Sequence, residues 1–323
     1  MSNALLEVQG LKTYFPIKGG VIRKTVGYVH AVEDVSFTIG EQETFALVGE
    51  SGCGKSTTGR SILRLVEPTA GAVRFDGEDL RALDGEAMRK KRRDMQLIFQ
   101  DPYSSLNPRM TMRKLLEETL RTHFSLSQKE LDERVHWIAD AVGFSRDQLG
   151  RYPHQFSGGQ RQRISIARAL ITNPRFVVAD EPVSALDVSI QAQVLNLLMK
   201  LQQEMKLSYL FISHDLNVVR HISSRVAVMY LGRIVETGNT EEVYCRPMHP
   251  YTQALLSAIP RRDPSDQKRR IHLEGDVPSP SNPPKGCAFH DRCSRCMAVC
   301  SETVPAPRRM PDGRLVLCHL YDE

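Results

Sequence analysis

The 323-residue chain lacks any run approaching the roughly 18 apolar residues of a membrane-spanning helix, so none is expected. It also lacks a basic start followed by an apolar run, which argues against a secretory signal and for residence in the cytoplasm. The net charge is only +5, far from the basic footprint of nucleic-acid binding proteins. We therefore expect no nucleic-acid partner, whereas a phosphate-rich ligand or an anionic membrane surface suits this charge.

Short apolar runs alternate with helical patterns through the middle of the chain. "FVVAD" and "LSYLFISH" are the β-branched, apolar runs that a strand buried on both faces requires, and "SIQAQVLNLLMKLQQEM" between them has helical spacing. The spacing from Met112 to Val142 is helical as well. This alternation predicts an α/β fold with a largely parallel sheet.

The two ends of the chain differ from the middle. "LLEVQGLKTYF" and "HAVEDVSFTI" read as strands, and the Gly- and Lys-rich "PIKGGVIRKTVGY" between them reads as a loop. After about Gly238 the chain becomes rich in proline and charge. The segments "PRRDPSDQKRR" and "VPSPSNPPKG" are expected to be linkers flanking a small cysteine-bearing tail.

A glycine-rich loop predicts nucleotide binding. "GESGCGKS" satisfies G-x-x-x-x-G-K-[ST] and stands between an apolar strand and a helix. The glycines let successive backbone N–H groups point at phosphate oxygens, Lys55 places a cation on the β- and γ-phosphates, and the Ser56 hydroxyl can ligate Mg²⁺. The predicted nucleotide-binding residues of this stretch are Gly49, Glu50, Ser51, Gly52, Cys53, Gly54, Lys55, Ser56 and Thr57.

Two carboxylates at the end of "RFVVADEP" predict hydrolysis. The apolar strand delivers Asp180 at its carboxyl end, where open α/β sheets bind ligands. Asp180 is placed to hold Mg²⁺ through water, and Glu181 is placed to polarise the attacking water.

A second set of backbone donors precedes another helix in "FSGGQRQRISIARAL". Ser157, Gly158, Gly159 and Gln160 there suit a phosphate group. One chain seldom needs two phosphate-binding helix starts for one nucleotide. Two head-to-tail chains do, if each nucleotide lies between the glycine-rich loop of one chain and the Ser-Gly-Gly of the other.

The motifs together resemble the ATP-binding subunits of ABC transporters. The nucleotide motifs are "GESGCGKST", "FSGGQ", "VVADEP", "SALD" and "ISHD". The match extends beyond them and is similar to the dipeptide/oligopeptide importer branch, most closely its F-type subunit. The further segments are "QDPYSSLNPRMT", "RYPHQFSGGQRQRI", "DEPVSALDVSIQAQVLNLL", "HPYTQALLSAIP" and "PSPSNPPKGCAFHDRC".

The resemblance implies an ABC-type ATPase domain with a mostly parallel core sheet, an antiparallel β subdomain and a helical subdomain. We expect this nucleotide-binding domain over residues 1–240, with the helical subdomain at about 101–168. Residues 241–323 would form the oligopeptide/dipeptide transporter C-terminal extension, with a metal site.

The resemblance also implies roles for residues outside the loops already described. Gln100 would contact Mg²⁺ and the nucleophilic water, and His214 would reach the γ-phosphate. Asp187 would lie in the loop bridging the two ATPase subunits. Phe15 falls where the family stacks an aromatic ring on adenine, with Tyr14 beside it as the alternative. The expected catalytic set is then Glu181, His214, Gln100 and Lys55, with Ser56, Gln100 and Asp180 around Mg²⁺.

The implied function is ATP hydrolysis that powers peptide import, by a peripheral protein on the cytoplasmic side of the cell membrane. The implied partners are a second ABC ATPase, a related D-type subunit, together with two transmembrane permease subunits and a periplasmic or extracellular peptide-binding protein. The sequence leaves open a soluble ABC ATPase, an importer of another substrate such as a metal chelate, and a metal-dependent regulatory protein.

Five of the seven cysteines lie in the last 37 residues, within and after "CAFHDRCSRCMAVC". In a reducing compartment such a cluster favours metal over disulfides. Four thiolates suit an iron–sulfur cluster or zinc, with His290 or His319 able to replace one thiolate on zinc. The resemblance implies a [4Fe-4S] cluster on Cys287, Cys293, Cys300 and Cys318, and Cys296 is a fifth candidate. Free thiols are the third alternative, beside the cluster and zinc.

Overall fold

The structure is a computed structural model that describes residues 4–19, 23–259 and 271–322. The chain divides into two compact units. The first unit consists of Met1–Ile39, Thr44–Arg81 and Ser213–Glu323, and the second of Gly40–Glu43 and Ala82–Ile212.

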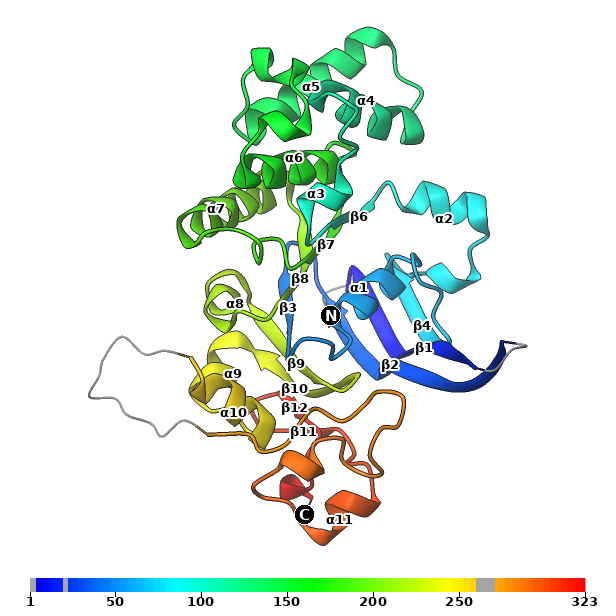
Figure 1. Cartoon of the computed structure of the whole chain (residues 1–323), viewed down its shortest axis with the longest axis vertical. Helices are drawn as coiled ribbons and strands as arrows, with labels where there is room; N and C mark the ends of the chain where they lie inside the picture. The colour runs from blue at the N-terminus through cyan, green and yellow to red at the C-terminus, as the bar shows by residue number, and fades with distance from the viewer. Residues whose placement is uncertain (1–3, 20–22, 260–270, 323) are drawn as a thin grey trace. The chain divides into compact units, whose positions relative to one another are not determined.

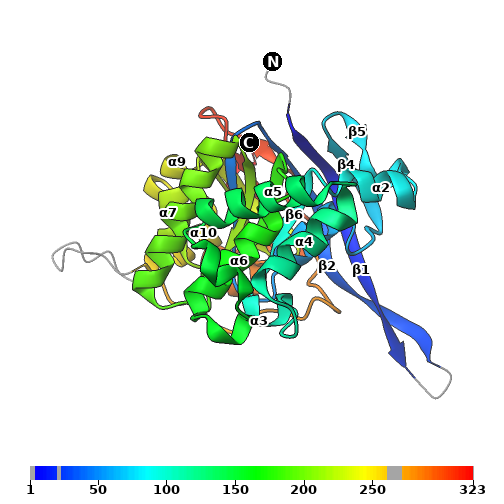
Figure 2. The ribbon, with the colours of Figure 1, turned by 90° about the horizontal axis from the view of Figure 1, so that it is seen from above.

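An antiparallel sheet in the first unit has the strand order β2-β1-β4-β5. β1 spans Leu6–Gly19, β2 Lys24–Ile39, β4 Ala70–Phe75 and β5 Glu78–Asp79. β1 and β2 run side by side as a long hairpin (Figure 2). The loop predicted for "PIKGGVIRKTVGY" is therefore wrong over its described residues, because cross-strand backbone hydrogen bonds carry both strands into it.

A second group of strands in the first unit leads to the carboxyl end of the chain. β3 (Thr44–Val48) pairs in parallel with β9 (Arg225–Tyr230), and β10 (Arg233–Asn239) pairs antiparallel with β9. β12 (Leu315–Val316) adds to β10, and β11 (Arg308–Arg309) adds to β12. The carboxyl-terminal segment thus extends a sheet of the first unit. The helices here are α1 Lys55–Ile62, α8 Leu216–Ile222, α9 Thr240–Cys245, α10 Pro250–Ser257 and α11 Ala298–Glu302, with 3-10 turns at His290–Arg292 and His319–Tyr321.

The second unit contains three parallel strands with buried side chains. They are β6 Met95–Ile98, β7 Phe176–Asp180 and β8 Ser208–Ser213. Its helices are α2 Gly85–Lys91, α3 Pro102–Ser105, α4 Met112–His123, α5 Gln128–Ala141, α6 Gly158–Leu170 and α7 Val188–Met205. Shorter 3-10 turns of this unit span Arg146–Gly150 and Pro153–Gln155, and the 3-10 turn Leu80–Ala82 falls at the boundary between the two units.

Helices α4, α5 and α6 gather into one group (Figures 1 and 2). The segment from Met112 to Val142, predicted to have helical spacing, contains the two helices α4 and α5. Ser127 ends the continuity because its hydroxyl caps α5 and the Glu130 carboxylate accepts the Ser127 backbone N–H. Buried Leu115, Leu116 and Leu120 form the inward face of α4.

The predicted α/β class is confirmed, with parallel core strands, an antiparallel β part and a helical part. "PRRDPSDQKRR" lies outside the described residues, whereas "VPSPSNPPKG" has no helix or strand, as predicted for a linker. Within the described ranges, no helix combines the length and apolar character needed to cross a bilayer. The domain boundary at residue 240 stays a prediction.

Candidate nucleotide-binding site

The phosphate loop follows β3, and its backbone requires glycine at both ends. Gly49 has φ +153° and Gly54 has φ +107°. A Cβ at Gly49 would lie 2.1 Å from the Met229 carbonyl oxygen, and one at Gly54 would lie 2.1 Å from the Ala31 carbonyl oxygen. Any side chain at these positions would therefore move the loop away from the backbone against which it packs.

Lys55 opens helix α1 and is buried, with 4% of the residue exposed. Its ammonium donates to the carbonyl oxygens of Gly49 (2.8 Å) and Glu50 (3.0 Å), which hold it across the loop. Cys53 inside the loop is buried, and burial raises the pKa of its thiol. A helix start and a fixed cation are features that suit phosphate groups, so phosphate binding by this loop stays a prediction.

In the second unit, the structure brings together two of the predicted catalytic residues. Asp180 ends β7 with 1% of its surface exposed, and Glu181 follows it. The Gln100 side-chain amide donates to the Glu181 carboxylate over 2.9 Å. Glu181 has φ +45°, a conformation that costs a non-glycine residue energy and is common at functional sites. The Glu181 N–H donates to the Ile212 carbonyl oxygen (3.0 Å), which holds the turn in this shape.

The Ser-Gly-Gly segment begins α6 with a reciprocal cap. The Ser157 N–H donates to Gln160 Oε1 (3.0 Å), and the Gln160 N–H donates to Ser157 Oγ (3.3 Å). Ser157 and Gly158 are exposed, as a contact with a ligand from a second chain would need. Gly159 is buried because Ile190 of α7 occupies the place of its side chain: a Cβ there would lie 2.4 Å from Ile190 Cγ2.

The remaining nucleotide-site candidates lie on exposed positions. Phe15 of β1 is 39% exposed, whereas the hydroxyl of neighbouring Tyr14 donates to Glu33 (2.5 Å) and its ring lies 4.2 Å from that of His30. Phe15 is therefore the more available aromatic face. Asp187 precedes α7 and His214 follows β8, and both are exposed.

The tail cysteines gather in the first unit. Burial, together with the neighbouring thiols of Cys300, Cys318 and Cys293, raises the pKa of Cys287 to about 11. The Cys287 N–H donates to the Cys300 carbonyl oxygen over 2.8 Å. Cys296 is exposed, and slight desolvation together with the thiols of Cys300 and Cys293 raises its pKa.

Both histidines weighed as alternative ligands have their ring nitrogens engaged. His290 contacts the Cys287 carbonyl oxygen (2.8 Å) and the Asp291 carboxylate (3.0 Å). His319 contacts the Asp322 carboxylate (2.5 Å) and the Thr303 carbonyl oxygen (2.8 Å). Among the described residues, no group of three or more His, Cys, Asp or Glu side chains is arranged to hold a metal ion. The structure thus gathers thiols without showing a metal site.

The phosphate loop is also contacted by two residues that the sequence did not point to. Arg292 pairs with the Glu50 carboxylate, and the Tyr251 hydroxyl accepts the Glu50 N–H. They lie 242 and 201 positions from Glu50 along the chain, so no local pattern could have indicated them.

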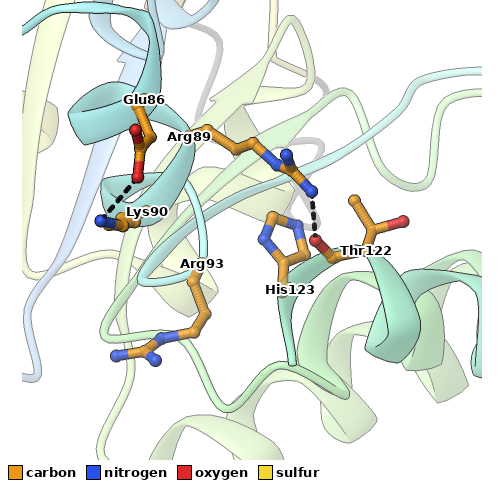
Figure 3. Close-up of a pocket in the computed structure, with 6 residues that line it drawn as sticks. All are labelled: Glu86, Arg89, Lys90, Arg93, Thr122 and His123. Atoms are coloured by element: carbon orange, nitrogen blue, oxygen red, sulfur yellow. Dashed lines mark hydrogen bonds and ion pairs between the residues drawn. The ribbon is translucent and has the colours of Figure 1, made fainter. Parts of the chain in front are cut away.

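A pocket of about 340 Å³ lies apart from every predicted motif (Figure 3). It is lined by Glu86, Arg89, Lys90, Arg93, Thr122 and His123. The Arg89 guanidinium donates to the Thr122 carbonyl oxygen (3.0 Å), and Lys90 pairs with Glu86 (2.9 Å). Its cations thus have partners within the protein.

Two family profiles match the chain. The ABC transporter profile matches residues 32–184, and the profile of the oligopeptide/dipeptide transporter C-terminal region matches residues 235–300.

The chain is similar over nearly its whole length to curated ATP-binding proteins. It is 52% identical to the oligopeptide transport ATP-binding protein AppF of Bacillus subtilis, covering 98% of this chain and 97% of that one. It is 49% identical to the dipeptide transport ATP-binding protein DppF of Escherichia coli, covering 100% and 96%. The DppF protein of Haemophilus influenzae is 51% identical, covering 98% and 97%.

Solved structures share the fold. A dimeric, post-hydrolysis structure of the ATP-binding cassette MJ0796 with ADP and Pi superimposes with a TM-score of 0.64 and 28% identity, covering 73% of this chain and 98% of that one. CbiO1 of Clostridium perfringens, part of an ABC transporter complex, gives a TM-score of 0.65 at 25% identity, covering 75% and 91%.

Proposed function

Since the chain belongs to the family of ATP-binding proteins of oligopeptide and dipeptide ABC transporters, we propose that it hydrolyses ATP to drive import of dipeptides or oligopeptides. The observation that carries the ATPase part is the 2.9 Å contact between Gln100 and Glu181 at the end of β7. This contact orients the Glu181 carboxylate, and no sequence pattern alone could have shown that Gln100 holds it.

Hydrolysis on these residues is mainly positioning and charge neutralisation. Glu181 polarises the attacking water and Gln100 keeps its carboxylate oriented, while Lys55 stabilises charge that develops on the γ-phosphate. Asp180 and the Ser56 hydroxyl would supply the hard oxygen ligands that Mg²⁺ prefers, and a bound Mg²⁺ would contribute charge neutralisation.

The proposed assembly is a pair of ATPase chains beneath two membrane permeases. The exposed Ser157–Gln160 cap would contact the partner's nucleotide, Asp187 would lie at the bridge between the chains, and His214 would sense the γ-phosphate. Phe15 would stack on adenine. A related D-type subunit is the proposed partner, and the solved dimer of a similar cassette supports pairing in general. We place the chain on the cytoplasmic side of the membrane, receiving peptides delivered by an external binding protein.

A [4Fe-4S] cluster on Cys287, Cys293, Cys300 and Cys318 is proposed for the tail, with zinc as the competitor. Its support is the gathering of these thiols and the engagement of both nearby histidines by other partners. Exposed Cys296 is the least suited of the five. Anaerobically purified protein without iron, sulfide or broad visible absorbance would eliminate the cluster, and stoichiometric zinc would identify the competitor.

The function is tested on the assembled transporter. Mild-detergent purification of the tagged chain should recover two polytopic membrane proteins. ATP turnover in proteoliposomes should then rise when peptide-loaded binding protein is added. Recovery without membrane partners would indicate a soluble ATPase, and stimulation by a metal chelate instead of peptides would indicate a different substrate.

A further inference from the structure

Glu50 places a carboxylate inside a loop that binds phosphates. Its side chain is 26% exposed, and two of its oxygens meet the guanidinium of Arg292: Nη1 at 2.9 Å from Oε2 and Nη2 at 3.4 Å from Oε1. The Arg292 side chain is only 8% exposed. Such a two-point, shielded pair is stronger and more directional than an exposed one.

The backbone of Glu50 is held as well. Its N–H donates to the Tyr251 hydroxyl (3.0 Å), and its carbonyl oxygen accepts from the Lys55 ammonium (3.0 Å). Glu50 therefore joins the residue that contacts phosphate to two residues of the carboxyl-terminal region.

Arg292 is fixed by an aromatic cluster beside the cysteines. Phe289 is 1% exposed, and its ring centroid lies 5.2 Å from that of Tyr230 and 5.3 Å from that of Tyr251. The Arg292 guanidinium lies 5.9 Å from the Tyr230 ring centroid. Because Cys293 follows directly, the segment that carries Cys287 and Cys293 also sets the position of Arg292.

We propose that Arg292 is a positioning residue that acts on the phosphate loop through Glu50: it neutralises the Glu50 carboxylate and so sets nucleotide affinity. Without Arg292, an unpaired carboxylate would repel the phosphates that Lys55 attracts. The cysteine segment thereby acts on the nucleotide site. This inference rests on the proposed ATP binding, but not on the identity of the transported substrate or on a metal in the tail.

The test compares Arg292→Gln, Glu50→Gln and the double variant in the full-length chain. Affinity for Mg-ATP is measured with a fluorescent nucleotide, and KM and kcat are measured separately. Arg292→Gln should weaken binding about tenfold, mostly in KM, and the double variant should return to within about threefold of wild type because no charge is left unpaired. Arg292→Lys should recover part of the affinity.

Arg308→Gln is the matched control, since Arg308 forms an exposed tail pair with Asp322, 3.2 Å away. It should bind Mg-ATP like wild type. Wild-type affinity in a folded Arg292→Gln protein, or a double variant as weak as Arg292→Gln, would overturn the proposal. If Arg292→Gln does not fold, Glu50→Gln decides: binding at least as tight as wild type supports the proposal, and weaker binding refutes it. Absence of peptide-stimulated turnover would instead count against the import function, because these affinities are compared on the isolated chain.

Discussion

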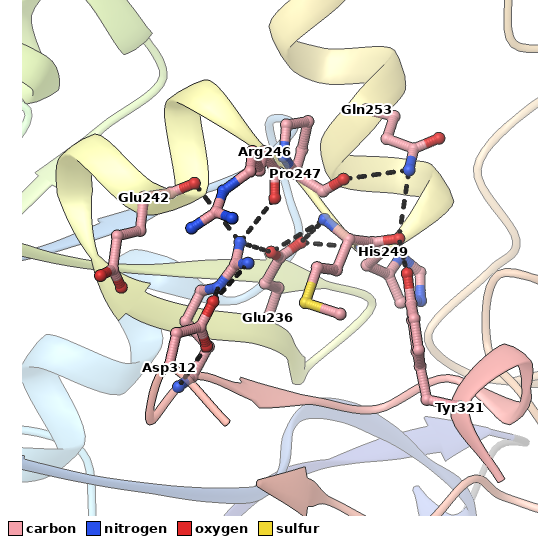
Figure 4. A network of polar contacts seen from close by, with 10 residues as sticks. Glu236, Glu242, Arg246, Pro247, His249, Gln253, Asp312 and Tyr321 are labelled. Carbon is pink, nitrogen blue, oxygen red and sulfur yellow. Dashed lines mark hydrogen bonds and ion pairs between the residues drawn. The ribbon is translucent and has the colours of Figure 1, made fainter. Parts of the chain in front are cut away.

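The Arg314 guanidinium lies 3.4 Å from the Glu236 carboxylate, and the two side chains are 4% and 0% exposed. Figure 4 shows the network of polar contacts around Glu236. Arg314 immediately precedes β12, and Glu236 lies on β10. Arg314 also pairs with Asp312 (2.7 Å) and donates to the Arg246 carbonyl oxygen (2.6 Å). This buried pair links the segment before β12 to β10, which belongs to the group of strands that includes β3 and β9.

The Glu236 carboxylate has further donors around it. The backbone N–H groups of Met248 (3.0 Å) and His249 (2.9 Å) donate to it. Burial raises the pKa of Glu236, while these N–H groups and Arg314 act in the opposite direction. These partners thus stabilise the ionised Glu236 carboxylate against the effect of burial.

Arg314→Ala should destabilise the chain by about 3 kcal/mol, because it leaves a buried carboxylate without its cation. The midpoint of urea denaturation measures the change. Arg308→Ala, which removes a pair exposed at both ends, should cost less than about 1 kcal/mol. Equal losses of stability in the two variants would show that the buried pair stabilises the fold no more than the exposed pair does.

Glu181→Gln should bind ATP like wild type and hydrolyse it at least about 100-fold more slowly, because the amide cannot polarise the attacking water. Gln100→Ala should lower kcat less, since it removes the residue that orients the carboxylate rather than the carboxylate itself. Single-turnover hydrolysis and equilibrium nucleotide binding separate the two effects. Near-normal turnover by Glu181→Gln would remove Glu181 from the catalytic role.

Gly158→Ala and Gly159→Ala form a matched pair at the start of α6. A Cβ at Gly158 would meet its nearest neighbour, Leu186 Cδ2, at 3.8 Å, whereas one at Gly159 would lie 2.4 Å from Ile190 Cγ2. Gly159→Ala should therefore cost about 1–3 kcal/mol of stability through overpacking, and Gly158→Ala should cost little. Thermal denaturation of both variants checks this, and equal melting temperatures would contradict it.

The parts of the site that follow one another along the chain could be predicted from the sequence. The glycines around Lys55 and the apolar run before Asp180 each specify a local structure, a turn before a helix and a buried strand. Local chemistry decides such features, and the structure agrees with them.

The parts that depend on distant partners could not be predicted. Arg292 reads as an ordinary charge in a polar tail, and its contact with Glu50 lies beside the packing of Phe289 on two tyrosines. The extension of β1 and β2 beyond the predicted strands was missed for the same reason, since glycine and lysine in "PIKGGVIRKTVGY" favour a loop until cross-strand hydrogen bonds override that preference.

Glu33 is the clearest acid-sensitive group near the proposed adenine side of the site. Burial would raise its pKa, but hydrogen bonds from Tyr14 (2.5 Å), His30 (3.0 Å) and Lys12 (2.9 Å) outweigh burial and lower the pKa to about 2. A carboxyl group whose pKa is lower in the folded than in the unfolded state stabilises the fold above its unfolded pKa. That stability is lost as the pH falls from about 4.5 towards 2.

Glu33→Gln should therefore lower stability by about 1–2 kcal/mol at pH 7, after allowance for the partial exposure of the pair, and should flatten the loss of stability between pH 4.5 and 2. Denaturation midpoints measured across this range in 0.15 M salt test both effects. Glu86→Gln is the control, because its pair with Lys90 is open to solvent and is screened. An unchanged acid slope in Glu33→Gln would mean that other carboxylates control the acid response. Since Tyr14 would donate to an uncharged acceptor at best while Phe15 next to it keeps its place on β1, a simultaneous weakening of nucleotide binding would link this cluster to the adenine contact.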